Sequence, residues 1–117
     1  MKRLIALVVV FVVCLGLSGS AATYKTFETV TVADTAVGLT STTYNPLGKP
    51  QMKNCVARVE TAEIRIRWDG TAPTSSVGVV VTALDIFYLD SNEDISQLKM
   101  IRTGGTSATV TFQCWTN

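Results

Sequence analysis

The stretch ATVTFQC, residues 108–114, alternates between apolar and polar side chains at every position. Such an alternation is typical of a β-strand that buries one face and leaves the other in water. The stretch IRIRW, residues 64–68, repeats the pattern with charged side chains on its polar face. Asp69 and Gly70 then predict a turn that ends this strand. The two stretches indicate a chain built from half-buried β-strands.

Further short strands are predicted along the chain. Residues 27–32 and 55–59 are rich in β-branched side chains, and residues 35–43 are another candidate strand. Residues 77–81 form a continuous apolar run that extends, after a break, to Leu84, Ile86 and Tyr88. A run of this kind favours a strand covered on both faces.

One segment has helix-like spacing. Within residues 91–101, Ile95, Leu98 and Ile101 recur on one side, and Ser91 or Asn92 could cap a single helical turn. About six to eight short strands with one helical turn predict an all-β fold, an antiparallel β-sandwich or jelly-roll-like domain.

Residues 1–22, MKRLIALVVVFVVCLGLSGSAA, differ in composition from everything that follows. A basic start precedes an apolar run over residues 4–17, and small residues follow it as far as Ala22. This order is typical of a secretory signal peptide, and the run is shorter than the roughly 20 residues that span a bilayer. We therefore expect an N-terminal hydrophobic signal helix over residues 1–22 and a single β-sandwich domain over residues 23–117.

The charge of the chain excludes some classes of partner. The sequence has 10 basic residues, 9 acidic residues and no histidine, and removal of Lys2 and Arg3 with the leader leaves a net charge of −1. A nearly neutral domain offers no basic surface for nucleic acid or anionic lipid. We expect no nucleic-acid partner, and no membrane partner after the leader is removed.

Two of the three cysteines belong to the mature domain. Cys14 lies in the leader, without the residues that precede a lipoprotein cysteine. Cys55 and Cys114 remain, and an even pair in an exported chain predicts a disulfide. The bond would close a loop of about 60 residues and contribute about 3–4 kcal/mol of stability. The alternative is two separate buried thiols.

Groups that catalysis and metal binding often need are missing or poorly placed. The absence of histidine excludes Ser-His-Asp and Cys-His nucleophiles and the common zinc sites. Glu60 and Glu63 would face opposite sides of a strand, unlike the carboxylate pair of a glycosidase. The acidic segment DSNED, residues 90–94, lacks the spacing of a calcium loop and suits the start of a helical turn. We predict no enzyme, no cofactor and no metal site.

The aromatic side chains divide into two groups by their positions. Trp68, Tyr88 and Phe112 occupy positions that predict an inward-facing, core role. Tyr44, in the long loop, and Trp115, near the C-terminus, are the better candidates for exposed aromatic contacts.

Two irregular loops are the natural contact surfaces of a sandwich. One covers residues 40–51, and the other is GTAPTSS, residues 70–76. The candidate interface residues from these loops and the last strand are Tyr44, Asn45, Pro46, Thr71, Pro73, Thr74 and Trp115.

Residues 59–115 contain a series of short motifs in a fixed order. The motifs are Ala62 to Arg65, Asp69 to Thr74, Gly78, Ile95 to Arg102 and Ala108 to Phe112. In this order they resemble a group of small tailed-phage proteins, over about half of the chain. The resemblance implies a small β-sandwich virion component, such as a capsid decoration (cement) protein or another accessory structural subunit, which binds symmetric sites on a protein shell.

Two functions are therefore open. The first is a non-enzymatic structural protein, an accessory phage virion subunit that packs onto a viral shell or its own copies; we expect a homo-oligomer located in the virion. The second is an exported binding module, secreted or periplasmic, that recognises a glycan or a surface protein. It would bind through the Tyr44 loop, the GTAPTSS loop and Trp115.

Overall fold

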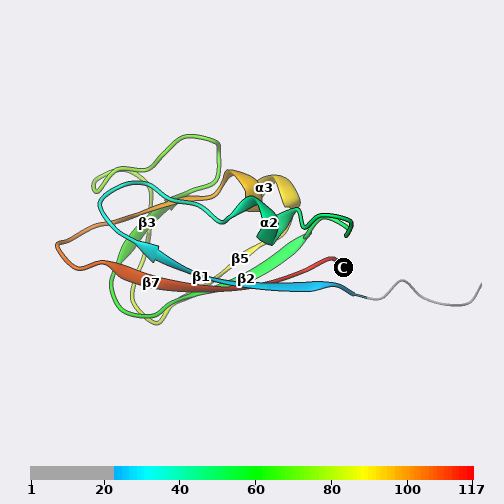
Figure 1. Cartoon of the computed structure of the whole chain (residues 1–117). Coiled ribbons are helices and arrows are strands. Elements are labelled where there is room, and N and C mark those ends of the chain that lie inside the picture. Colours follow the sequence, from blue (N-terminus) through cyan, green and yellow to red (C-terminus); the bar gives the residue numbers. More distant parts are fainter. Residues whose placement is uncertain (1–22) are drawn as a thin grey trace, which may run out of the picture.

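A computed structural model of the protein describes residues 23–117, which form seven strands in two antiparallel sheets together with two short helices (Figure 1). This architecture is mainly β and is consistent with the predicted β-sandwich. The expected signal peptide over residues 1–22, with Cys14, lies outside the described residues.

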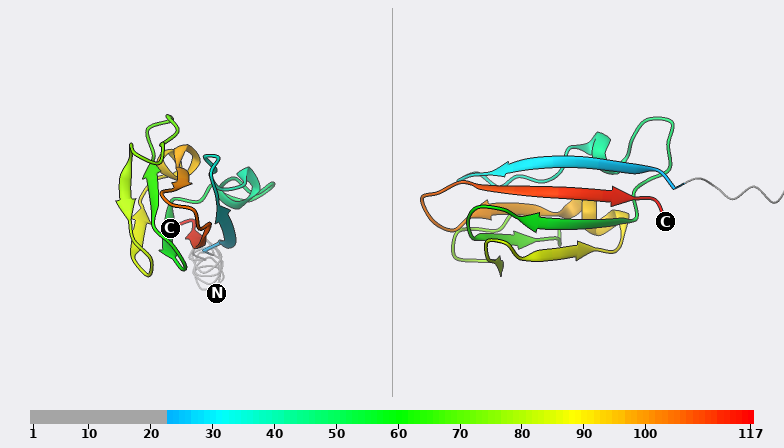
Figure 2. Two further views of the ribbon diagram at one scale, coloured as in Figure 1. Left: turned by 90° about the vertical axis from the view of Figure 1, so that its left-hand side faces the viewer. Right: turned by 90° about the horizontal axis from the view of Figure 1, so that it is seen from below.

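The four-stranded sheet, called sheet A, has β7 at its centre. Its strands, in spatial order, are β1 (Lys25–Val32), β7 (Ala108–Trp115), β2 (Asn54–Val59) and β5 (Ile86–Leu89). Figure 2 (right) shows this order face-on. Ala108, Val110, Phe112 and Cys114 of β7 are buried, and the alternate residues from Thr109 to Trp115 face the other side of the sheet. The half-buried strand predicted from the alternation over residues 108–114 is therefore confirmed.

The three-stranded sheet, called sheet B, covers part of the inner face of sheet A. Its strands, in spatial order, are β4 (Val79–Val81), β3 (Ile64–Arg67) and β6 (Lys99–Arg102). Ile64 and Ile66 are buried, whereas Arg65 and Arg67 are half-buried on the opposite face. This arrangement confirms the second predicted strand.

Two short helices lie on the same side of sheet A as β3 (Figure 1). They are α2 (Ser41–Tyr44) and α3 (Asn92–Gln97). The Ser91 hydroxyl oxygen accepts a hydrogen bond from the Asp94 N–H at 3.1 Å, which confirms the predicted helical turn and selects Ser91 as its cap.

Residues 35–43 do not form the predicted strand. Val37 makes a single bridge to Met100, with N–O distances of 2.9 and 2.8 Å, and the chain then turns into α2. The helix-like spacing also ends early, because Ile101 belongs to strand β6.

The core lies between the layers and contains the disulfide. Cys55 on β2 and Cys114 on β7 are directly opposite, with their Cα atoms 4.1 Å apart, and both are buried. This is the close spacing of cross-strand pairs that exchange no backbone hydrogen bonds. The predicted disulfide is confirmed. The largest fully buried side chains of the core belong to Phe112, Met52, Ile64, Ile95, Leu98 and Met100.

Three predictions of burial are wrong. Phe112 is fully buried as predicted, but Trp68 is 41% exposed and Tyr88 is 66% exposed. The apolar run over residues 77–81 is not covered on both faces, because Val79 and Val80 are 52% and 43% exposed. The reason is position in the sheets: β4 and β5 are edge strands, and Trp68 follows the end of β3.

Candidate interaction surface

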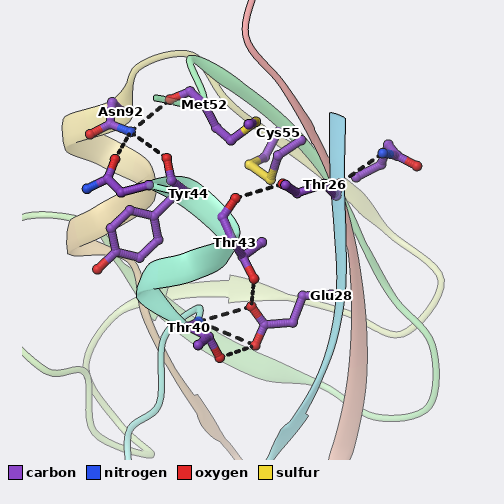
Figure 3. The surroundings of a disulfide bond; sticks show 11 residues. Thr26, Glu28, Thr40, Thr43, Tyr44, Met52, Cys55 and Asn92 are labelled. Carbon is purple, nitrogen blue, oxygen red and sulfur yellow. Dashed lines mark hydrogen bonds between the residues drawn. A yellow bond between two sulfur atoms is a disulfide. The ribbon is translucent and has the colours of Figure 1, made fainter. Parts of the chain in front are cut away.

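The predicted contact loop around Tyr44 is held against the start of α3 (Figure 3). The Asn92 side-chain amide nitrogen lies 3.2 Å from the Tyr44 carbonyl oxygen, 3.1 Å from Asn45 Oδ1 and 2.9 Å from the Met52 carbonyl oxygen. Tyr44 itself is half-buried and packs against the core, and Pro46 is half-buried too. Of the three predicted contact residues in this loop, Asn45 is the exposed one.

Glu28 fixes α2 to strand β1 (Figure 3). Its carboxylate accepts hydrogen bonds from the Thr40 N–H at 3.0 Å, the Thr40 hydroxyl at 2.8 Å and the Thr43 hydroxyl at 2.6 Å. The Thr26 hydroxyl donates in turn to the Thr43 carbonyl oxygen at 2.7 Å. Glu28 therefore supplies the cap that the Thr40 side chain does not give to this helix.

Arg65 holds the second predicted loop in place. Its Nε donates to the Ser75 carbonyl oxygen at 3.0 Å, and its guanidinium donates to the Gly78 carbonyl oxygen at 2.8 Å. Gly78 has a φ of 137° and packs so tightly that an added Cβ would lie 3.1 Å from the Ile66 carbonyl oxygen and from Pro73 Cβ. Pro73, predicted as a contact residue, is buried under this loop.

An ion pair shapes the entry to the same loop. The Arg67 guanidinium lies 2.5 Å from the Asp69 carboxylate, which also accepts the Thr71 N–H at 3.2 Å. The hydrogen bond from Arg67 and then the one from Thr71 hold the pKa of Asp69 below its ordinary value. Thr71 and Thr74 are exposed on the loop that this pair begins.

Trp115 is the last residue of β7 and is half-buried. Its neighbours across the strands are Lys25 on β1 and Asn54 on β2. It borders an open depression of about 430 Å³ whose other walls are Thr23, Lys25, Gln113 and Asn117.

The structure does not gather the predicted contact residues into one site. Figures 1 and 2 show the loop after α2 near the end of the molecule that carries the C-terminus, well away from the loop between β3 and β4. Each loop is an ordered turn held by its own side-chain hydrogen bonds. The Tyr44 loop and the GTAPTSS loop therefore do not combine into one surface.

A different surface collects the exposed apolar side chains. Seven of the ten large apolar residues that are exposed belong to β4, β5 and the segments next to them. We call this set the edge patch: Trp68, Val77, Val79, Val80, Leu84, Ile86 and Tyr88. These side chains lie along one edge of the domain, with Val80 on the outer face of sheet B and Ile86 and Tyr88 on the outer face of sheet A. Exposed apolar groups of this kind are candidates for a contact surface. In the sequence, the edge patch corresponds to a segment with apolar side chains at both odd and even positions and with few charged residues.

The edge patch includes an open cavity of about 290 Å³. Val79 pairs with the buried Ile66 and therefore lies on the core side of sheet B. Trp68 and Val77 complete the apolar walls, and the Arg67–Asp69 ion pair lies at the same cavity. The cavity is thus a part of the inner face of sheet B that no other described segment fills.

The outer face of sheet A carries a second, more mixed surface, which Figure 2 (right) shows uncovered. One row across its four strands is Phe27, Gln113, Val56 and Tyr88. The next row is Thr29, Thr111, Arg58 and Ile86. Phe27 and Tyr88 are exposed at opposite ends of the first row.

The described part of the chain gives no geometry for a metal site. Within residues 23–117, no three side chains of His, Cys, Asp or Glu come together in a group that could hold an ion. Over the same residues, no helix has both the length and the apolar character needed to cross a membrane.

The chain was compared with protein families, with curated proteins and with solved structures. None of the three comparisons finds a match.

Proposed function

We propose that the protein is a non-enzymatic structural subunit that works through protein–protein contacts, as an accessory (decoration- or cement-like) component of a phage virion. The edge patch carries this proposal, because a disulfide-braced domain that exposes such a group of apolar side chains is suited to a lasting protein contact. The finer description of the fold as jelly-roll-like belongs to the same proposal.

The motifs shared with small tailed-phage proteins support the proposal through their structural roles. Residues 62–65 lead into β3, and residues 69–74 make the turn held by the Arg67–Asp69 pair. Gly78 fits a site with no room for a side chain. The remaining two motifs form α3 with β6, and the central strand β7. Each motif therefore specifies the scaffold, as expected for a structural subunit.

Mass spectrometry of purified virions tests the proposal. Particles from cells that carry the gene should contain the protein in many copies, at a constant ratio to the shell protein. Its absence from particles, with the protein present in the cell or medium, would refute the proposed function. The intact mass of the natural protein should also show whether residues 1–22 are removed, and should be lower by two hydrogens for the disulfide.

A second candidate function is an exported, secreted or periplasmic module that binds a glycan or a surface protein. The observation in its favour is the open outer face of sheet A, where Phe27 and Tyr88 share a row and Trp115 lies in the row next to it. Flat aromatic side chains on a sheet suit stacking against sugar rings. Binding on a glycan array that Phe27→Ala, Tyr88→Ala and Trp115→Ala each weaken would support this candidate. A glycan array on which the protein binds nothing would exclude a glycan-binding function.

A further inference from the structure

The edge patch combines two open strand edges. β4 is the last strand on one side of sheet B, and β5 is the last strand on one side of sheet A. Residues 82–85 connect the end of β4 directly to the start of β5, so both open edges lie on the same side of the domain. The end-on view in Figure 2 (left) shows the two strands together on that side. In each strand, the outer backbone groups have no sheet partner among residues 23–117.

The two edge strands are short, of three and four residues, and short length itself hinders pairing with other molecules. They lack the other protective features, which are charged side chains, prolines, bulges and covering segments. Between Ser75 and Leu89 the only residue charged at neutral pH is Asp85, and no proline occurs. The Asp85 carboxylate already accepts the Thr82 hydroxyl at 2.5 Å. β4 thus offers an uncharged apolar edge.

The connection between the two strands keeps another apolar side chain in solvent at a backbone cost. Leu84 has a φ of 72° and is 61% exposed. The left-handed region costs a non-glycine residue about 1 kcal/mol or more, and leucine there gains no compensating burial within the described chain. Leu84 precedes Ile86 and Tyr88 at alternate positions, and all three side chains are exposed.

We infer that the occupant of the edge patch is a second copy of this chain, joined by antiparallel pairing of β4 with β4 about a two-fold axis. The pairing would continue sheet B across the interface as a six-stranded sheet, from three strands in each copy. Valine side chains of the partner copy would then lie over the cavity beside Val79 and Trp68.

The charge distribution favours a second copy. A two-fold contact brings each surface against itself, so a charged patch would repel its copy. The edge patch is apolar, and the ions at its cavity, Arg67 and Asp69, are paired within one chain. Arg65 has no ion-pair partner among the described residues, but it lies on β3, one strand back from the open edge, and donates to carbonyl groups of its own loop. Self-pairing would also place the valine side chains of each β4 strand beside those of its copy.

The oligomeric state of the purified protein tests this inference. Light scattering after size-exclusion chromatography should give twice the mass of one chain. Val80→Lys places a charge on the open edge, on the face away from the core, and should halve the solution mass. The matched control is Leu47→Lys, since Leu47 is 93% exposed and lies outside the patch. This control should remain a dimer.

A monomeric wild-type protein up to millimolar concentration would overturn the inference, and so would a Val80→Lys variant that stays dimeric. Dimers lost in Phe27→Lys but kept in Val80→Lys would place the contact on sheet A and overturn it as well. Isotope-filtered NOEs in a mixed-label dimer should connect the Val79 and Val80 methyl groups of one copy to β4 of the other. Their absence from a wild-type dimer would count against β4 pairing without requiring any variant to fold.

The dimer inference rests on the proposed function only because both involve the edge patch. Experiments can contradict either one without contradicting the other. A protein that is present in particles but monomeric in solution overturns the dimer alone. A dimer that is missing from particles overturns the virion function alone.

Discussion

Gly38 occupies a position where a hydrogen atom fits and a methyl group does not. An added Cβ would lie 2.4 Å from the Leu98 carbonyl oxygen, so the backbone near the Val37–Met100 bridge would have to move. We expect Gly38→Ala to lower the free energy of unfolding by about 1–3 kcal/mol, as overpacked sites do, in chemical denaturation. Gly104→Ala is the control, because nothing lies within 4 Å of its Cβ, and its effect should stay within about 0.5 kcal/mol. Equal losses in the two variants would contradict the steric explanation.

Asp69 makes the β3–β4 loop sensitive to acid. Hydrogen bonds from Arg67 and Thr71 lower its folded pKa below the unfolded value, which is about 3.9. The stabilising effect of the carboxylate is therefore complete above the unfolded pKa, and it disappears as the pH falls through the lower folded pKa. In an NMR titration, the Thr71 amide shift should change with a midpoint below the ordinary aspartate range. Asp69→Asn should remove this transition, and a midpoint at or above the ordinary pKa would disprove the assignment.

At the scale of elements, α2 depends on a side chain from another strand. Its four residues are too few for a helix that is stable alone, and Glu28 on β1 supplies its hydrogen-bond acceptors. We expect Glu28→Gln to lower the free energy of unfolding by about 1–3 kcal/mol, because charge-assisted hydrogen bonds are lost. Glu63→Gln is the control, since this carboxylate is exposed and its side chain accepts from Thr103 alone. A Glu28 effect no larger than that of Glu63 would argue against the capping role.

The elements that could be predicted from the sequence are those with local causes. Alternation specifies β7 and β3 residue by residue, and the Ser91 hydroxyl caps α3 within three positions. α2 and β6 could not be predicted, because distant contacts decide them. Glu28 caps α2 from 12 to 15 positions away, and β6 is defined by its pairing with β3. The candidate strand over residues 35–43 failed for the same reason.

The interaction surface was harder to predict than the fold. Turn residues located both loops, but Arg65 and Asn92, which hold those loops, act on carbonyl groups 10 to 48 positions away. The apolar run over residues 77–81 favours a strand covered on both faces, which the structure does not show. Sequence periodicity does not distinguish burial in the core from burial by a partner, so it could not show that β4 and β5 are edges.

At the scale of the whole molecule, the disulfide closes a loop that contains six of the seven strands, from β2 to β7. Restriction of the unfolded chain by this loop, of 59 positions, should contribute about 3–4 kcal/mol. Reduction should therefore shift the denaturation midpoint markedly lower. The Cys55→Ala, Cys114→Ala double variant should resemble the reduced protein and should not respond to reductant. An unchanged midpoint after complete reduction would contradict this effect.

Both sulfur atoms belong to buried residues, so the bond should also be slow to react in the native fold. Thiol labelling in the presence of reductant should follow the rate of unfolding, and labelling of the folded protein at the rate of a free thiol would contradict this expectation.

The central place of β7 has a consequence for how the chain reaches its fold. β1 and β2 both pair with β7, which follows every other described strand in the sequence. Topologies with such distant pairings fold in about milliseconds to seconds, more slowly than those with local contacts. A nascent chain that emerges N-terminus first would carry β1 and β2 without their common neighbour. Because of this strand order, β1 and β2 of the new polypeptide stay unpaired until β7 has been made. A chaperone can bind these strands before sheet A forms.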